Sequence, residues 1–159
     1  MALHGVWGLP QRMVPEVTLP GGAYFRGPGR VRVRRFEEFD TWRLGDRLVA
    51  SPVAALVQAL PELPRDTAVS VLDSAMHLER IEPADLEKIR AGLKGKRGAR
   101  KVYPWLDLTS PLAQSPFETR TRLQCHDAGL QRPILQATVV DDRGREIAHG
   151  DLGWKRDDG

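Results

Sequence analysis

The sequence has one cysteine, few aromatic residues and no long apolar run. Cys125 is the single cysteine among 159 residues, so no internal disulfide can form, which suits a reducing compartment. No segment approaches the roughly 18 to 20 apolar residues that a membrane-spanning helix needs. The N-terminal "MALHGVWGLPQRM" is too broken by glycine and proline for a secretory signal. We therefore expect a cytoplasmic protein with no membrane partner.

Several familiar kinds of site are also absent from the sequence. No G-x-x-x-x-G-K-[ST] string is present for nucleotide phosphates, and no Ser/His/Asp arrangement can be read locally. The spacing of the histidines relative to Cys125 does not fit a zinc site. These histidines are His4, His77, His126 and His149.

Positive charge is concentrated in two segments of the first 114 residues. From Ser115 onward, seven Lys and Arg residues face eight Asp and Glu residues, so the net charge of +3 arises before that point. In "RVRVRRF", strand alternation places Arg30, Arg32 and Arg34 on one face. A solvated face and a phosphate-binding face explain this strand equally well.

The second basic segment runs from Lys88 to Lys101, "KIRAGLKGKRGARK", and contains seven cations and no acid. Unpaired like charges repel one another unless an anion neutralises them, which favours phosphate binding over a solvated face. Glycines at 92, 95 and 98 interrupt the helical pattern and would let backbone approach a phosphate. The predicted DNA contacts are Lys94, Lys96, Arg97, Arg100 and Lys101.

The N-terminal half reads as strands followed by helices. Strand patterns occur in "VPEVTLP" and "GRVRVRRF", and "TWRLGDRLVA" predicts a short pair turning at Gly45 and Asp46. Helices are predicted for "SPVAALVQALPEL", for about 65–78, and from Glu82 onward. The basic segment and "VYPWLDLTSPLAQ" are then expected to act as a connection.

From Ser115 the pattern becomes one helix and a hairpin. The helix "SPFETRTRLQCHDAGL" ends near Gly129, and strands at 134–140 and 146–154 flank the turn "DDRG". The fold class is therefore α/β of the α+β kind. The apolar side of the helix is expected to comprise Phe117, Thr121, Leu123, Cys125 and Leu130.

The series of motifs resembles a known family. The stretch from "SPFETR" to "HGDLGW" resembles the start of the nuclease domain of very-short-patch-repair-like endonucleases, in the PD-(D/E)XK superfamily. Upstream, "ALHGVWGLP", "VTLPGG", "VASPVAALVQALPEL" and "AVSVLDSAMHLERI" resemble the middle part of AbiEi-type antitoxins. The resemblance implies an AbiEi-like region at 1–105 and an incomplete nuclease-like domain at 115–159.

In that family, the Glu of S-P-x-E and the Asp of the D-L-x-W strand help to bind a divalent metal. The resemblance implies that Glu118 and Asp151 have these catalytic and Mg²⁺-binding roles, because hard carboxylate oxygens hold Mg²⁺ beside a scissile phosphate. Glu118 also fits a capping box with Ser115, since S-x-x-E is its signature. Asp151 also fits an ordinary strand end.

The sequence departs from the family pattern at both ends. Family members continue into a third strand with an E-x-D-G string, and usually have a winged-helix segment before "LHG". Here "KRDDG" follows Trp154, where Asp157 or Asp158 would have to replace the missing acid. The resemblance thus implies a fragment truncated at both ends, in which the metal site lacks part of its ligands.

Two functions follow from this reading. The first is a DNA-binding protein related to metal-dependent endonucleases, catalytically incomplete as given. The second is an antitoxin-like transcriptional regulator or protein-interaction module with no nuclease role. Expected partners are DNA, a toxin, or a second copy of the chain through the exposed hairpin edge.

Overall fold

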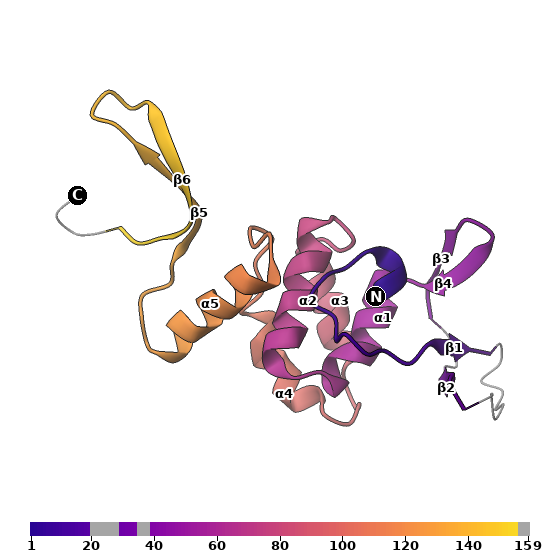
Figure 1. The fold of residues 1–159 in the computed structure, drawn as a ribbon. Helices are drawn as coiled ribbons and strands as arrows, with labels where there is room; N and C mark the ends of the chain where they lie inside the picture. The colour runs from indigo at the N-terminus through magenta and orange to yellow at the C-terminus, as the bar shows by residue number, and fades with distance from the viewer. Residues whose placement is uncertain (20–28, 35–38, 156–159) are drawn as a thin grey trace.

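The computed structural model describes residues 1–19, 29–34 and 39–155 and has a mixed α/β architecture. A central body of helices separates two groups of strands. Figure 1 shows short strands at one end of this body and a hairpin projecting from the other, beyond the last helix. The predicted α/β fold class is confirmed.

The first two helices form as predicted. Helix α1 (Pro52–Ala59) begins after Ser51, whose hydroxyl accepts a hydrogen bond from the Ala54 N–H at 3.3 Å, and a 3-10 turn follows at Leu60–Glu62. Helix α2 spans Arg65–His77. In both helices, the apolar residues that recur at helical spacing in the sequence form the buried side. The expected core residues that are buried are Leu56, Val57, Leu60, Ala68, Val71, Leu72 and Ala75.

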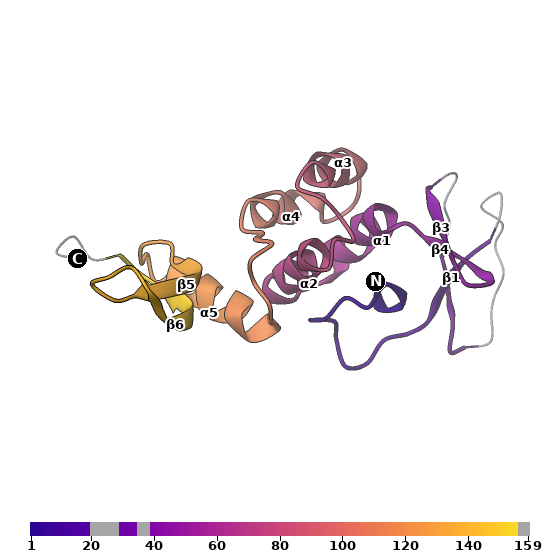
Figure 2. The ribbon, with the colours of Figure 1, turned by 90° about the horizontal axis from the view of Figure 1, so that it is seen from above.

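Two further helices complete the body. Helix α3 (Asp85–Gly92) begins three residues later than Glu82, because the Asp85 carboxylate accepts the Glu82 N–H at 3.0 Å in a preceding turn. Helix α4 spans Ala99–Leu106. Figure 2 shows α3 and α4 along one side of the body, with α1 and α2 below them in this view. No described helix is long and apolar enough to cross a membrane.

The sequence predicts a connection after α3, but residues Ala99–Leu106 form helix α4, so this prediction is wrong for them. Three glycines and Pro104 argue against a helix there, since proline removes a backbone N–H. Tertiary burial overrides this local preference: Val102 is fully buried and Leu106 is 2% exposed, both in the core cluster. The segment is therefore a core element whose outer face is basic.

Four short strands lie at the N-terminal end. Strands β1 (Glu16–Thr18) and β2 (Arg32–Arg34) pair in parallel, and the link between them includes residues outside the described ranges. Strands β3 (Thr41–Leu44) and β4 (Arg47–Ala50) form the predicted antiparallel pair, turning at Gly45, which has φ 61°. The strand pattern of the sequence is confirmed for these residues.

Helix α5 (Pro116–Asp127) forms where it was predicted, and Leu123 of its expected apolar side is buried, but two other expected members are exposed. Phe117 is 76% exposed and Leu130, beyond its end, is 56% exposed. The buried residues of the helix are Glu118, Thr119, Arg122 and Leu123. The helix therefore turns a largely polar face toward the body, and polar contacts must hold it there.

Those polar contacts meet at Asp73 of α2, which is fully buried. Its carboxylate accepts hydrogen bonds from the Thr119 hydroxyl, the Ser110 N–H and the Arg122 guanidinium, each at 2.7 Å. Arg122 also donates to the Leu108 carbonyl. Burial raises the pKa of the Asp73 carboxyl, and the positive charge of Arg122 opposes that rise. The network fixes α5 and the preceding connection to α2.

The predicted C-terminal hairpin is confirmed. Strand β5 (Ile134–Val140) pairs antiparallel with β6 (Glu146–Gly153), with a bulge between Val139 and Val140. It forms a two-stranded sheet separate from the other strand pairs. Leu135 is buried at its base, whereas most of its outer half is exposed.

Asp73→Ala should lower the free energy of unfolding by about 3–5 kcal/mol, because Arg122 would remain buried without its carboxylate. The matched control is Asp66→Ala on the same helix, where the acid is half exposed and its loss should cost less than about 1 kcal/mol. Urea unfolding of the two variants measures the difference. Equal destabilisation would contradict a central role for the buried pair.

Candidate nucleic-acid interface

Five cations surround the turn between α3 and α4, and all five side chains belong to exposed residues. Within the described ranges, no acidic side chain forms an ion pair with any of them. One of the five, Lys101, lies over the Trp105 ring at 5.5 Å from its centroid. We call this set the basic turn. Its members are Lys94, Lys96, Arg97, Arg100 and Lys101.

The start of α4 adds a second electrostatic feature to the basic turn. The N-cap residue is Gly98, with φ 84°, and no side chain caps the first backbone N–H groups. The first turn contains no acid and instead contains Arg100 and Lys101. A helix N-terminus carries partial positive charge, so these cations increase a local field that an anion would neutralise.

The three glycines of the segment have different roles. A side chain on Gly92 would meet Val57 Cγ2 at 2.9 Å, so this glycine lets α3 pack on α1. Gly98 is in the left-handed region and lies against Pro61. A side chain on Gly95, by contrast, would meet no atom within 4 Å. Only Gly95 leaves open space for the approach to phosphate expected from the sequence.

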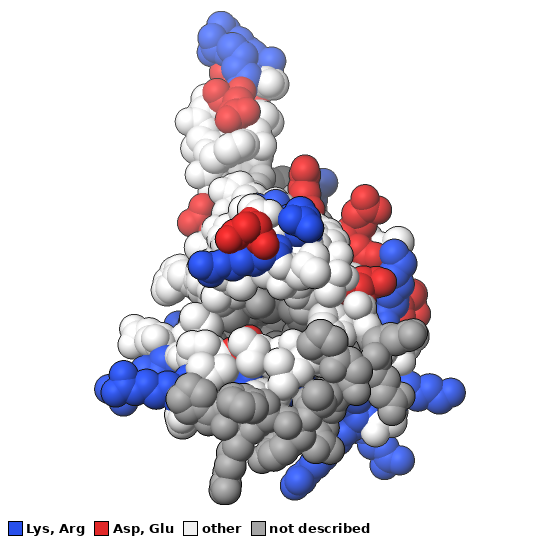
Figure 3. All heavy atoms as spheres, turned by 90° about the vertical axis from the view of Figure 1, so that its right-hand side faces the viewer, with Lys and Arg blue, Asp and Glu red and all other residues white. Residues whose placement is uncertain are grey.

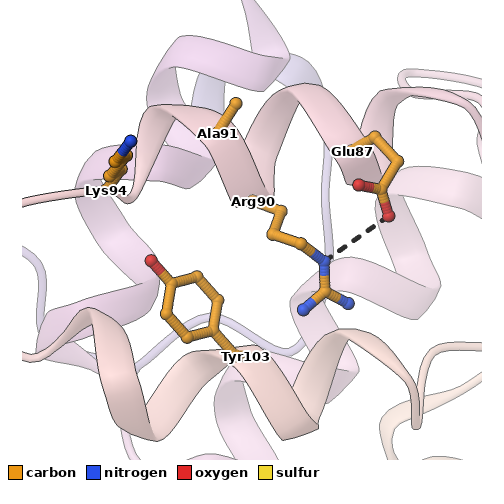
Figure 4. A pocket seen from close by; sticks show the side chains of 5 residues that line it. All are labelled: Glu87, Arg90, Ala91, Lys94 and Tyr103. Carbon is orange, nitrogen blue, oxygen red and sulfur yellow. Dashed lines mark ion pairs between the residues drawn. The ribbon is translucent and has the colours of Figure 1, made fainter.

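A shallow hollow between α3 and α4 adjoins the basic turn (Figure 4). Its lining includes Arg90, Lys94 and Tyr103. The Arg90 guanidinium lies 5.8 Å from the Tyr103 ring centroid and forms ion pairs with Glu87 at 3.4 Å and Asp107 at 2.9 Å. Arg90 is therefore held by the fold, whereas Lys94, the other cation at this hollow, has no acidic partner among the described residues.

The other predicted basic face is arranged differently. Arg34 contacts Glu16 and Glu62 at 2.8 Å each, and Arg32 contacts the same two acids. The hydrogen bonds from Arg34 lower the pKa of the Glu62 carboxyl. Alternation does put both arginines on one face, but acids of the chain already neutralise them. Arg30 is exposed and has no ion pair with a described residue.

Glu118 is 6% exposed and closes a capping box at the start of α5. Its Oε1 accepts from the Ser115 hydroxyl at 2.8 Å, and Ser115 Oγ accepts from the Glu118 N–H at 3.2 Å. Its Oε2 accepts from the Gln114 N–H and from Gln136 Nε2, both at 3.1 Å. Both carboxylate oxygens therefore already have donors.

Asp151 lies on β6 and is exposed. The flanking pairs, Leu135 with Leu152 and Ala137 with Gly150, place it across from Gln136, the residue that contacts Glu118. Gln136 has φ 53°, so the ladder is irregular at this point. The side chain of Gln136 thus links the hairpin to α5. Gln136 bonds to Glu118, and its own position on β5 is opposite Asp151.

This arrangement does not fit a metal centre well. Among the described residues, no group of three or more His, Cys, Asp or Glu side chains could hold a metal ion. A cation at Glu118 would have to displace amide and hydroxyl donors that already satisfy its oxygens. Asp157 and Asp158, the candidates for a further acid, lie outside the described residues.

Comparisons with known proteins give no relative for this chain. No protein-family model, no curated protein and no solved structure matches it. The family resemblance seen in the motifs therefore stays a prediction.

Two contributors to these sites were not singled out from the sequence. Gln136 reaches Glu118 from a strand 18 residues away, and nothing in local spacing marks it. Tyr103 lies in the segment expected to be a connection, so its place beside Arg90 depends on α4 being a helix. The helical spacing of Ala99, Val102 and Leu106 was the available signal.

Exchanging the Glu118 carboxylate for an amide separates capping from metal binding. Glu118→Ala should lower the free energy of unfolding by about 1–3 kcal/mol, because it leaves buried donors unpaired. Glu118→Gln should cost less than about 1 kcal/mol, since glutamine also serves in a capping box. Thermal melts with and without Mg²⁺ check both. A Mg²⁺-dependent rise in melting temperature that disappears in Glu118→Gln would show that the carboxylate binds metal.

Proposed function

We propose that this protein binds DNA through the basic turn without cleaving it, as a relative of the AbiEi-type antitoxins and very-short-patch-repair-like endonucleases. The observation that carries the proposal is that exposed cations without a described acidic partner are clustered in the basic turn. Several lysines and arginines elsewhere pair with acids, and exposed ones that do not, such as Arg12, Arg43 and Arg143, are scattered along the chain. The five of the basic turn are instead clustered between Lys94 and Lys101 and have no acidic partner among the described residues. Polyanionic DNA supplies the missing negative charge.

The geometry supports phosphate contact more than base reading. The basic turn offers ammonium and guanidinium groups at the start of a helix, which are general phosphate ligands. The segment Lys88 to Lys101 contains no asparagine or glutamine, the side chains that pair with adenine edges. We therefore expect duplex DNA to be bound with little sequence preference.

The absence of cleavage rests on the roles of the two carboxylates. Glu118 is occupied in the capping box, and Asp151 has no described acidic neighbour that completes a metal site. Phosphodiester hydrolysis needs a metal with a fixed coordination sphere beside the scissile phosphate. This favours a regulatory, antitoxin-like role over an endonuclease. Weak Mg²⁺ binding at Glu118 and Asp151 stays a prediction of the family resemblance.

Reversing charges in the basic turn tests the binding. The combined Lys96→Glu, Arg97→Glu, Arg100→Glu variant should bind a short mixed-sequence duplex about 100-fold or more weakly. For the unaltered protein, the affinity should fall with salt with a log–log slope of about 0.9 per phosphate contacted, reaching about 4 to 5 if all five cations take part. Fluorescence anisotropy across a salt series measures both.

The matched control carries the same change in net charge elsewhere. Arg12, Arg43 and Arg143 are exposed and form no ion pair with a described residue. Their combined reversal to Glu should weaken binding only slightly, through the general field of the protein. Equal loss in the two triple variants, or no binding even at low salt, would leave the basic turn as a solvated face.

Plasmid nicking tests the absence of cleavage. With Mg²⁺ or Mn²⁺, the protein should nick supercoiled DNA no faster than background, because the described residues provide no group of three or more metal ligands. The informative comparison uses Glu118→Gln and Asp151→Ala, of which the first preserves the capping box. Metal-dependent nicking by the unaltered protein that both variants abolish would overturn this part of the proposal.

A further inference from the structure

The β5–β6 hairpin projects beyond α5, and its outer part has no covering element among the described residues. Figures 1 and 2 show this projection in two directions. In Figure 3, charged side chains gather at the hairpin tip, and the stem below them is uncharged over this face. Val139 and Val140 are 47% and 54% exposed, and Ile147 is 64% exposed. A lone two-stranded hairpin is marginally stable in water, so a partner that covers this surface would stabilise it.

The two free edges of the hairpin differ in charge. Strand β6 carries Glu146, His149 and Asp151, and charged side chains on an edge disfavour pairing with another strand. Strand β5 has the sequence "ILQATVV", with no charge and no proline over seven residues. Such an edge is a template for strand addition. The β5 edge is therefore the one to be covered.

We propose that two copies of the chain associate by antiparallel pairing of their β5 strands about a two-fold axis at Ala137. The strand is nearly self-complementary about this residue. Ile134 then lies opposite Val140 of the second copy, and Leu135 lies opposite Val139. Gln136 comes opposite Thr138 in this register, but its side chain contacts Glu118 of its own chain and its φ of 53° makes the strand irregular there, so the apolar pairs on either side of it carry the contact.

Charges flanking the strand support the same register. Arg132 lies two residues before β5, and Asp142 lies two residues after it, in the turn of the hairpin, so the proposed pairing would bring each of them near the other in the second copy. Both residues are exposed, and neither forms an ion pair within the described part of its own chain. A two-fold axis produces this pair twice, at the two ends of a four-stranded sheet. This association is independent of DNA binding by the basic turn.

Sedimentation equilibrium of the full chain tests the edge. The unaltered protein should dimerise at micromolar concentration, and Val140→Lys should shift it to monomer, because a lysine would enter the apolar contact. Ile147→Lys places the same charge on β6, at a position at least as exposed, and should leave the dimer intact. Circular dichroism establishes that both variants fold. A monomer at high micromolar concentration, or equal loss in both variants, overturns the proposal.

Charge reversal tests the register. Arg132→Asp and Asp142→Arg should each weaken the dimer about tenfold, since each creates two like-charged pairs, and the double variant should recover to within about threefold. Arg143→Asp alters the neighbouring charge in the same turn, which has no partner in the proposed pairing, and should leave the dimer Kd unchanged within about twofold. A double variant as weak as the single ones would overturn the register and the proposal with it.

Discussion

The position of α5 and of the hairpin beyond it depends mainly on polar contacts, of which the central one is the buried ion pair of Asp73 with Arg122. Buried Leu123 and the ion pair of Arg65 with Asp127 add to it. Helix α5 has no continuous apolar face, so the hydrophobic effect alone cannot seat it on the helical body. Asp73 supplies an anchor inside α2, and Arg122 and Thr119 reach it from α5. A buried pair of this kind adds little net stability compared with apolar packing, but it allows few alternative arrangements. It therefore acts mainly to specify where α5 lies.

The position of the hairpin depends on α5, which the Asp73 contacts hold on α2. Gln136 donates to Glu118 at the first turn of α5, and Trp154 Nε1 donates to the Gln131 carbonyl at 2.7 Å. Leu135 is the buried apolar residue at the base. Every one of these contacts is at the end of the hairpin near α5. The opposite end thus projects with no covering element among the described residues, which leaves a strand edge open to another chain.

Sequence reasoning succeeded where a local signal and burial agree. Serines followed by proline gave the starts of α1 and α5, and the spacing of apolar residues gave the buried faces of α1 and α2. It failed on α5, because a buried face made of Thr119 and Arg122 can be recognised only when its partner Asp73 is known. The partner is 46 to 49 residues away along the chain, so no local pattern reveals it.

The same limit explains the candidate sites. S-x-x-E at Ser115 supports both a capping box and a metal ligand, and only the donors around Glu118 distinguish them. Likewise, Arg32 and Lys96 look alike in the sequence. Arg32 proves to be paired because Glu16 and Glu62 come from separate elements, whereas Lys96 has no acidic partner among the described residues. A run of positive charge thus indicates a binding surface only when the structure shows which of its residues pair with acids of the same chain.

The helical state of α4 changes the meaning of the basic turn. Buried Ala99, Val102 and Leu106 fix one side of the helix in the core, which leaves Arg100 and Lys101 on the outer side. Had this segment been a loose connection, binding an anion would first have to order its backbone, at a cost in conformational entropy. Here the core has already ordered it. The helix that was not predicted therefore favours phosphate binding, because the backbone that carries Arg100 and Lys101 is already ordered and loses less freedom on binding than a loop would.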